Sequence, residues 1–150
     1  MKKVNIISLG CSKNLVDTEL LLKQLDKAGF QTEADVEDSD ADVVVINTCG
    51  FIGDAKEESV NTILEQVERK KQGEVERVYV IGCLSQRYKD ELIKEIPEVD
   101  AFFGKFDWRG VLGQLQLKYD ETIHNQRNLT TPSHYAYLKI SEGCNRTCSY

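Results

Sequence analysis

Three of the five cysteines in this 150-residue chain occupy equivalent places in a repeated pattern. Cys11, Cys49 and Cys83 each follow a short apolar run and precede a segment with helical spacing, and they are 38 and 34 residues apart. These separations suit one strand–helix unit each, and the carboxyl ends of parallel strands meet at one edge of a sheet. Three thiolates at that edge would form a soft, negatively charged pocket suited to zinc or an iron–sulfur cluster, with one metal position left open.

The same cysteines have a simpler interpretation, because free cysteines are commonly buried as small hydrophobic residues. For any one of the three this is the ordinary expectation. Their equivalent positions in three successive units favour a shared site instead. A disulfide framework is not expected, because five is an odd number and nothing in the sequence indicates secretion.

Cys144 and Cys148 form a second group, in the segment Glu-Gly-Cys-Asn-Arg-Thr-Cys-Ser-Tyr at residues 142–150. Two cysteines with three residues between them are weak evidence of a site, since such a pair occurs by chance. On a loop after a strand they could supply two ligands of a cluster whose third ligand lies beyond residue 150.

The runs before the three cysteines predict the elements that position them. Residues 4–9, 43–46 and 78–81 are brief and rich in β-branched residues, as in strands buried on both faces of a parallel sheet. A further strand is expected near residues 99–103. Apolar residues at helical spacing follow the strands: Leu21, Leu25 and Ala28; Val60, Ile63, Leu64 and Val67, with Asp54 as a cap; Leu92, Ile93 and Ile96; and Trp108, Val111, Leu112 and Leu115. This order predicts an α/β fold, an open and mostly parallel sheet with helices on both faces, flavodoxin-like or Rossmann-like.

The domain organisation follows from a change of character after Leu117. Residues 1–117 are expected to form the first domain. Residues 118–133 are polar and show no periodicity, so they are expected to be a linker. Residues 134–150 open with a strand-like run, Tyr135 to Ile140, which predicts the start of a second domain that is cut short.

Composition and charge narrow the classes of function. No apolar run approaches the roughly 20 residues that a membrane-spanning helix requires, and the start lacks a signal-peptide core, so a cytoplasmic protein is expected. The net charge is −6, and residues 31–60 hold nine acids and one base. Nucleic acids attract clustered Lys and Arg, so direct nucleic-acid binding by this domain is not expected. The acidic block is either a solvated surface or a surface that favours a basic partner.

Four separated blocks of the chain resemble the methylthiotransferases of the radical S-adenosylmethionine class. They are residues 8–17 (SLGCSKNLVD), 47–52 (NTCGFI), 82–84 (GCL) and 134–148, in family order over essentially the whole chain. The turn after the first strand resembles the branch that modifies an aspartate of ribosomal protein S-twelve more than the sister branch that modifies tRNA. The resemblance implies that the complete enzyme adds a methylthio group to the β-carbon of that aspartate, and that this stretch alone is inactive.

The resemblance also implies roles for single residues. Cys11, Cys49 and Cys83 would hold an auxiliary four-iron four-sulfur cluster. Cys144 and Cys148 would be the first two ligands of a second such cluster, the one that generates the radical in the first part of a barrel domain. The third ligand would directly follow Tyr150, and the Tyr150 position would lie close to S-adenosylmethionine. Ribosomal protein S-twelve would be the substrate, and an electron donor such as flavodoxin a partner.

Three alternatives stay open on the residues alone. Within the family, the tRNA-modifying branch shares the three-cysteine plan. A flavodoxin-like binding module with structural cysteines would share the fold, although residues 10–15 lack a phosphate-cradling GxGxxG loop. The chain could also be a folded domain without metal, with its thiols reduced or oxidised to one another.

Overall fold

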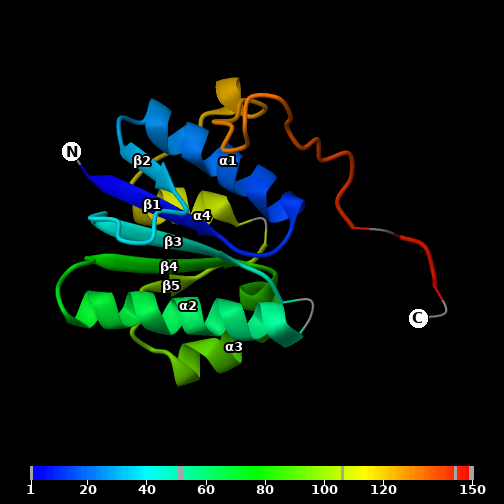
Figure 1. Cartoon of the computed structure of the whole chain (residues 1–150). Coiled ribbons are helices and arrows are strands. Elements are labelled where there is room, and N and C mark those ends of the chain that lie inside the picture. Colours follow the sequence, from blue (N-terminus) through cyan, green and yellow to red (C-terminus); the bar gives the residue numbers. More distant parts are fainter. Residues whose placement is uncertain (1, 51–52, 106, 144, 149–150) are drawn as a thin grey trace.

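The computed structural model describes residues 2–50, 53–105, 107–143 and 145–148, and within these residues a five-stranded parallel sheet forms the centre of the molecule. The strands lie in the order β2-β1-β3-β4-β5 (Figure 1). This is the order of flavodoxin-like doubly wound sheets. The predicted fold class is therefore confirmed, and every strand pair is parallel. The strands are β1 (Lys3–Ser8), β2 (Gln31–Ala34), β3 (Val43–Thr48), β4 (Arg77–Gly82) and β5 (Ala101–Phe102).

Helices cover both faces of the sheet, as the sequence predicts. The helices α1 and α4 lie on one face, and α2 and α3 lie on the other (Figure 1). None of the described helices is both long and apolar enough to cross a membrane. The helices are α1 (Ser12–Lys27), α2 (Gly53–Lys71), α3 (Cys83–Glu95) and α4 (Trp108–Gln114), followed by a short 3-10 turn, η1 (Glu121–Ile123).

The alternation of side chains along β3 explains the two cores. Val43 and Val45 belong to the core beneath α1 and α4. Val44 and Ile46 belong to the core beneath α2 and α3. Because successive side chains of a strand point to opposite faces, a strand covered on both faces must be apolar throughout. This is why residues 43–46 read as a continuous apolar run.

The sequence pattern misses β2 and misplaces some helical side chains. Gln31–Ala34 is a polar edge strand that pairs only with β1, so it has no apolar run to reveal it. Leu64 and Ile93 were expected on buried helix faces, yet both are exposed. Asp54 lies in the first turn of α2 rather than at the capping position before the helix.

Residues 135–140 form no strand in this structure, contrary to the strand-like pattern of the sequence. A strand is defined by hydrogen bonds to a neighbouring strand, and no other strand lies beside this segment in the described part of the chain. The side chains of Leu138 and Ile140 are 81% and 87% exposed. The segment instead runs away from the sheet as an irregular chain (Figure 1).

Part of the expected linker is seated on α1. Gln24 of α1 exchanges two hydrogen bonds with the backbone of Asp120, at 3.0 and 2.9 Å. Ile123 is buried, and the Asn128 amide donates to the Glu19 carbonyl at 3.1 Å. Backbone polar groups of this segment therefore find partners on α1, although its sequence carries no helical or strand period.

Candidate functional site

Cys11, Cys49 and Cys83 line one pocket at the carboxyl edge of the sheet. The pocket has a volume of about 1040 Å³. It opens beyond the ends of β1, β3 and β4, which stop at one level because Ser8 pairs with Asn47 and Thr48 pairs with Gly82. The structure therefore brings together the three cysteines that the sequence placed in equivalent positions. The pocket is lined by Ser8, Leu9, Gly10, Cys11, Lys13, Cys49, Asp54, Ala55, Glu58, Cys83 and Lys105.

The first turn of the site packs directly against the second. The Leu9 amide donates to the Asn47 carbonyl at 2.9 Å, which extends the β1–β3 ladder past Ser8. At Gly10 a Cβ atom would stand 2.5 Å from the Cβ of Cys49 and 2.9 Å from its Sγ. Only glycine lets the backbone before Cys11 approach Cys49 this closely. Cys11 itself has extended backbone angles and begins α1 as its N-cap.

Two buried asparagines tie these turns together. The Asn14 side chain donates to the carbonyls of Leu9 at 2.9 Å and Thr48 at 3.0 Å. The Asn47 side chain donates to the Asn14 carbonyl at 2.9 Å. Asn14 therefore neither caps α1 nor lines the pocket, but joins the turns that carry Cys11 and Cys49. The sequence offered no clear signal for this role, because α1 buries several other polar side chains as well.

A buried serine holds the backbone of Cys49. The Ser59 hydroxyl accepts a hydrogen bond from the Cys49 amide and donates one to the Cys49 carbonyl, both at 3.1 Å. The Ser59 side chain is fully buried between α2 and the turn after β3. Sequence reasoning missed this residue, because nothing in the spacing of α2 distinguishes it from an ordinary small core residue.

We expect Ser59→Ala to lower the free energy of unfolding by about 1–3 kcal/mol, because it leaves the buried Cys49 amide without a partner. Thr62→Ala on the same helix is the matched control, since the Thr62 hydroxyl donates only to the Glu58 carbonyl on the exposed surface. That control should change the stability by no more than about 0.5 kcal/mol. Urea unfolding measures both variants. Equal losses would show that the Ser59 contacts do not hold the turn.

The charges around Cys83 act on its thiol in opposite directions. Burial raises the pKa of Cys83, while the Lys105 ammonium acts to lower it and the neighbouring Cys49 and Cys11 raise it further. The net effect keeps the Cys83 thiol protonated more firmly than an exposed thiol. The influence of Cys49 and Cys11 on this pKa also reflects how close the three thiols are.

The three thiols are soft donors of the kind that bind zinc or an iron–sulfur cluster. Among the described residues, no three His, Cys, Asp or Glu side chains gather closely enough to hold one ion. The three thiols nevertheless face one large pocket, and each is free of disulfide bonds. An iron–sulfur cluster needs thiolates that stand farther apart, because each binds a different iron atom. Cys49 is buried, Cys83 is half-buried and Cys11 is exposed, so the pocket has a closed and an open side.

The second predicted group lies partly outside the described residues. Cys144 and Tyr150 are not among them. Cys148 is described, is exposed and free of disulfide bonds, and does not line the pocket of the other three cysteines. The predicted roles of these three residues remain predictions.

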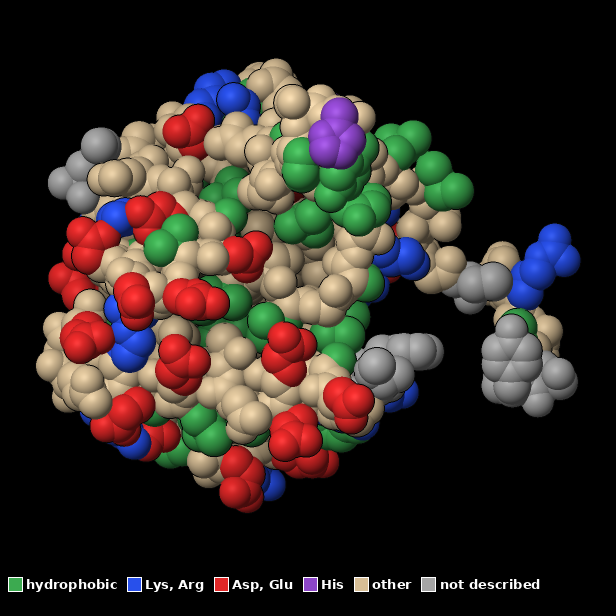
Figure 2. Space-filling model, in the orientation of Figure 1, with side chains coloured by type: hydrophobic (Ala, Val, Ile, Leu, Met, Phe, Trp, Pro, Cys, Tyr) green, Lys and Arg blue, Asp and Glu red, His purple; other side chains and the backbone are tan. Residues whose placement is uncertain are grey.

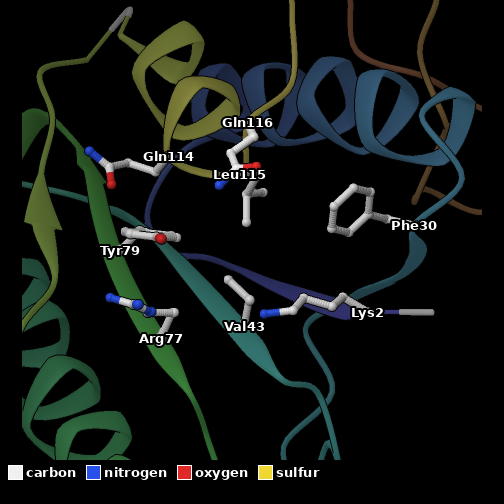
Figure 3. Close-up of a pocket in the computed structure, with 8 residues that line it drawn as sticks. All are labelled: Lys2, Phe30, Val43, Arg77, Tyr79, Gln114, Leu115 and Gln116. Atoms are coloured by element: carbon white, nitrogen blue, oxygen red, sulfur yellow. The ribbon is translucent and has the colours of Figure 1, made fainter.

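A different pocket lies at the opposite, amino-terminal edge of the sheet (Figure 3). It has a volume of about 320 Å³ and reaches from Lys2 to the first residues of β3 and β4, Val43 and Arg77. Its lining contains no thiol or imidazole group. It therefore offers no soft ligand for a metal, which leaves the carboxyl edge as the candidate metal centre.

Comparison with known families decides where the chain belongs. Residues 3–104 match the family described as "Uncharacterized protein family UPF0004". The chain belongs to the UPF0004 family. The matched residues contain the whole sheet and all three cysteines of the pocket, and they end one residue before Lys105, the last residue of the pocket lining.

Curated relatives extend the similarity of this UPF0004 chain beyond residue 104. It is 58% identical over 149 residues to "Ribosomal protein uS12 methylthiotransferase RimO" of Bacteroides thetaiotaomicron. It is 57% and 53% identical over 148 residues to the proteins of the same name from Porphyromonas gingivalis and Cytophaga hutchinsonii. In each case the match covers 99% of this chain and 34% of the relative. The chain thus spans about a third of the length of these relatives.

Proposed function

We propose that this chain forms the part of a ribosomal protein uS12 methylthiotransferase that carries an iron–sulfur cluster on Cys11, Cys49 and Cys83. The observation that carries the proposal is the convergence of these three thiols on one pocket, in a chain 58% identical to a protein of that name. The relatives named above are all uS12 enzymes, which favours the ribosomal protein over tRNA as the substrate.

The residues around the pocket supply binding and orientation. Gly10, Asn14 and Asn47 hold the first two turns together, and Ser59 fixes the backbone of Cys49. Buried Cys49 would anchor the cluster on the closed side. The exposed Cys11 side, with one iron position left without a thiolate, would admit a sulfur ligand or the substrate. Lys105 beside Cys83 would offset part of the negative charge of three thiolates.

The second half of the proposal concerns the end of the chain. Cys144 and Cys148 would be two ligands of a second four-iron four-sulfur cluster, and Tyr150 would lie beside S-adenosylmethionine. When bound, these groups would supply the radical and sulfur-transfer chemistry, which belongs to the cofactors rather than to the side chains. The support is the similarity to the methylthiotransferases, which extends through residues 134–148.

The acidic surface supports a basic protein as the partner. Figure 2 shows acidic side chains spread over the face formed by α2 and by the connection between β2 and β3. Four of the nine acids in residues 31–60 have internal partners: Glu33 and Asp40 pair with Lys3, while Asp35 and Asp42 accept backbone hydrogen bonds. The other five, Glu37, Asp38, Asp54, Glu57 and Glu58, are exposed.

Ribosomal proteins bind RNA, so a positively charged uS12 would be attracted to these five acids. The same acids disfavour direct nucleic-acid binding by this domain. A ribosomal substrate would place the protein in the cytoplasm, together with an electron donor such as flavodoxin.

Anaerobic reconstitution with iron and sulfide tests the ligand assignment. We expect the wild-type chain to bind iron with the visible absorption of a cluster, and Cys49→Ala to lose most of that iron because one ligand is gone. Cys148→Ala is the matched control, because Cys148 lies outside the pocket, and it should keep the pocket's iron. Circular dichroism confirms that both variants fold. An unchanged iron content in Cys49→Ala would overturn the assignment.

The same preparation distinguishes a cluster-binding domain from the alternative, a flavodoxin-like binding module. The strand order 2-1-3-4-5 is shared with flavodoxin, so the fold alone does not separate the two functions. A purified chain with flavin absorption and no capacity for iron would favour the flavodoxin-like module. Thiols that titrate freely in a chain that binds neither group would favour a domain with purely structural cysteines.

A further inference from the structure

We propose that a chain of four alternating charges, Asp17, Lys139, Glu142 and Lys105, positions the segment that leads to Cys144 and Cys148 relative to the three-cysteine pocket. We call these four residues the ionic clasp. The contacts among these four residues are features of this chain and do not depend on the proposed function. The functional meaning rests on the proposed function, in which both cysteine groups bind clusters that must work together.

The contacts of the ionic clasp are continuous. The Lys139 ammonium donates to Asp17 Oδ1 at 2.7 Å and lies 2.6 Å from Glu142 Oε2. The other Glu142 oxygen, Oε1, accepts from the Lys105 ammonium at 2.5 Å. The side chains are between 7% and 24% exposed, so none of these ion pairs is an ordinary surface pair. Pairs shielded from water to this degree are screened much less by salt than exposed ones.

The clasp joins both walls of the pocket to the segment. Asp17 lies on α1, whose N-cap is Cys11, and Lys105 lines the pocket after β5. Glu142 precedes Cys144 by two residues in the sequence. The chain just before the second cysteine group is therefore tied to the helix that begins at the first cysteine and to a side chain beside the third.

Backbone hydrogen bonds and apolar burial contribute little to the position of this segment in the described part of the chain. Within the described residues, no backbone hydrogen bond joins residues 136–142 to the sheet or its helices. Leu138 and Ile140 point into solvent, so apolar burial does not hold the segment either. Lys139, which lies between these two residues in the sequence, instead reaches Asp17 of α1.

The clasp provides fixed geometry more than stability. Burial raises the pKa of Asp17 even though Lys139 stands beside it. The pKa of Lys139 is nevertheless raised and that of Glu142 lowered, because in both cases the ion pairs outweigh burial, so the pKa directions do not all favour separation of the charges. Partly buried ion pairs of this kind often add little free energy, and their best attested use is to select one arrangement over others. Such a role suits a segment that must present two ligands at a defined distance from another site.

Spin-label distances in metal-free protein test the clasp. Nitroxides on Asp26→Cys of α1 and Ile140→Cys of the segment would be introduced after all five native cysteines are replaced by serine. Both label positions are exposed. We expect a narrow distance distribution that broadens in Lys139→Met and in Glu142→Gln, because each variant removes one charge of the clasp. Lys139→Arg keeps the charge and should keep the narrow distribution.

Lys118→Met is the matched control, because Lys118 is an exposed lysine of the preceding segment without an ion pair in the described part of the chain. It should leave the distribution unchanged. Melting temperatures of all variants should remain close together, which a purely stabilising role would not give. A distribution that is already broad with the intact clasp, or that stays narrow in Lys139→Met and Glu142→Gln, would overturn the proposal. Since no metal is present, this result is independent of the iron test of Cys49→Ala.

Discussion

Gly82→Ala should destabilise the chain by about 4 kcal/mol, through the sum of backbone strain and a steric clash. Gly82 has φ 104° and ψ −164°, a region that essentially only glycine occupies. A Cβ atom there would stand 2.4 Å from the Thr48 carbonyl oxygen and 2.7 Å from the Thr48 nitrogen. Because both are backbone atoms of the neighbouring strand, neither can turn aside. The turn that presents Cys83 would separate from the turn that presents Cys49.

Substitutions at two other glycines distinguish the effect of backbone strain from the effect of the steric clash. Gly29 also has a positive φ, 85°, but no atom lies within 4 Å of the Cβ position, so Gly29→Ala should cost only about 1 kcal/mol of strain. Gly113 in α4 has neither problem, and its replacement by alanine should stabilise the helix by about 0.5 kcal/mol. Urea unfolding measures the series. A loss for Gly82→Ala no larger than that for Gly29→Ala would show that the close approach of the two turns is absent.

The fold could be predicted wherever burial of an element produces a recognisable pattern of apolar residues in the sequence. The strands β1, β3 and β4 are covered on both faces and appear as apolar runs, and α1 to α4 each carry an apolar stripe. The edge strand β2 has no such signature, because its side chains are half-exposed and polar. The strand is recognised only by its pairing with β1. This pairing depends on the tertiary structure and cannot be read from the local sequence.

The three thiols of the candidate site could be predicted from the sequence. The residues that hold the cysteine-bearing turns in place could not. Equivalent positions in three strand–helix units were sufficient to bring Cys11, Cys49 and Cys83 to one edge. Asn47 and Ser59 act through hydrogen bonds to backbone atoms of other turns, and these contacts depend on distances that spacing alone does not give. The ion pair between Lys105 and Glu142 was equally hidden, because it joins residues 37 positions apart.

The segment after Leu117 shows the clearest limit of sequence patterns. Its polar composition is typical of a linker, yet it packs along α1 through hydrogen bonds together with the buried side chain of Ile123. A polar segment can be firmly seated when a neighbouring helix presents buried acceptors. Glu19 is such an acceptor, since its side chain is only 1% exposed and it lies on a helix that the sequence describes as an ordinary amphipathic one.

Glu19→Ala should therefore release this segment and lower the free energy of unfolding by about 3 kcal/mol, because it removes one partner of a buried ion pair. Glu19 Oε2 lies 3.3 Å from the Arg127 guanidinium, and Oε1 accepts hydrogen bonds from the amide and the hydroxyl of Thr130 at 2.9 and 3.1 Å. Arg127 Nη1 is buried without any hydrogen bond in good geometry, so the Glu19 charge is what compensates it. Without that charge, Arg127 regains water only if the segment leaves α1.

The pair formed by Glu121 and Arg109 provides the control, since it joins the same two residue types at a similar distance, 3.2 Å, with both side chains more than half exposed. Glu121→Ala should cost less than about 1 kcal/mol, as exposed pairs do. Unfolding in urea, which adds no ions, compares the two variants without screening either pair. Amide exchange at Thr130 should quicken in Glu19→Ala alone, because its hydrogen bond ends on the Glu19 carboxylate. Exchange at Asn128 should follow, because its bond to the backbone carbonyl of Glu19 opens once the segment leaves α1. Equal costs for the two variants, with unchanged exchange, would mean that burial of Glu19 adds nothing and that the segment is held by Gln24 and Ile123.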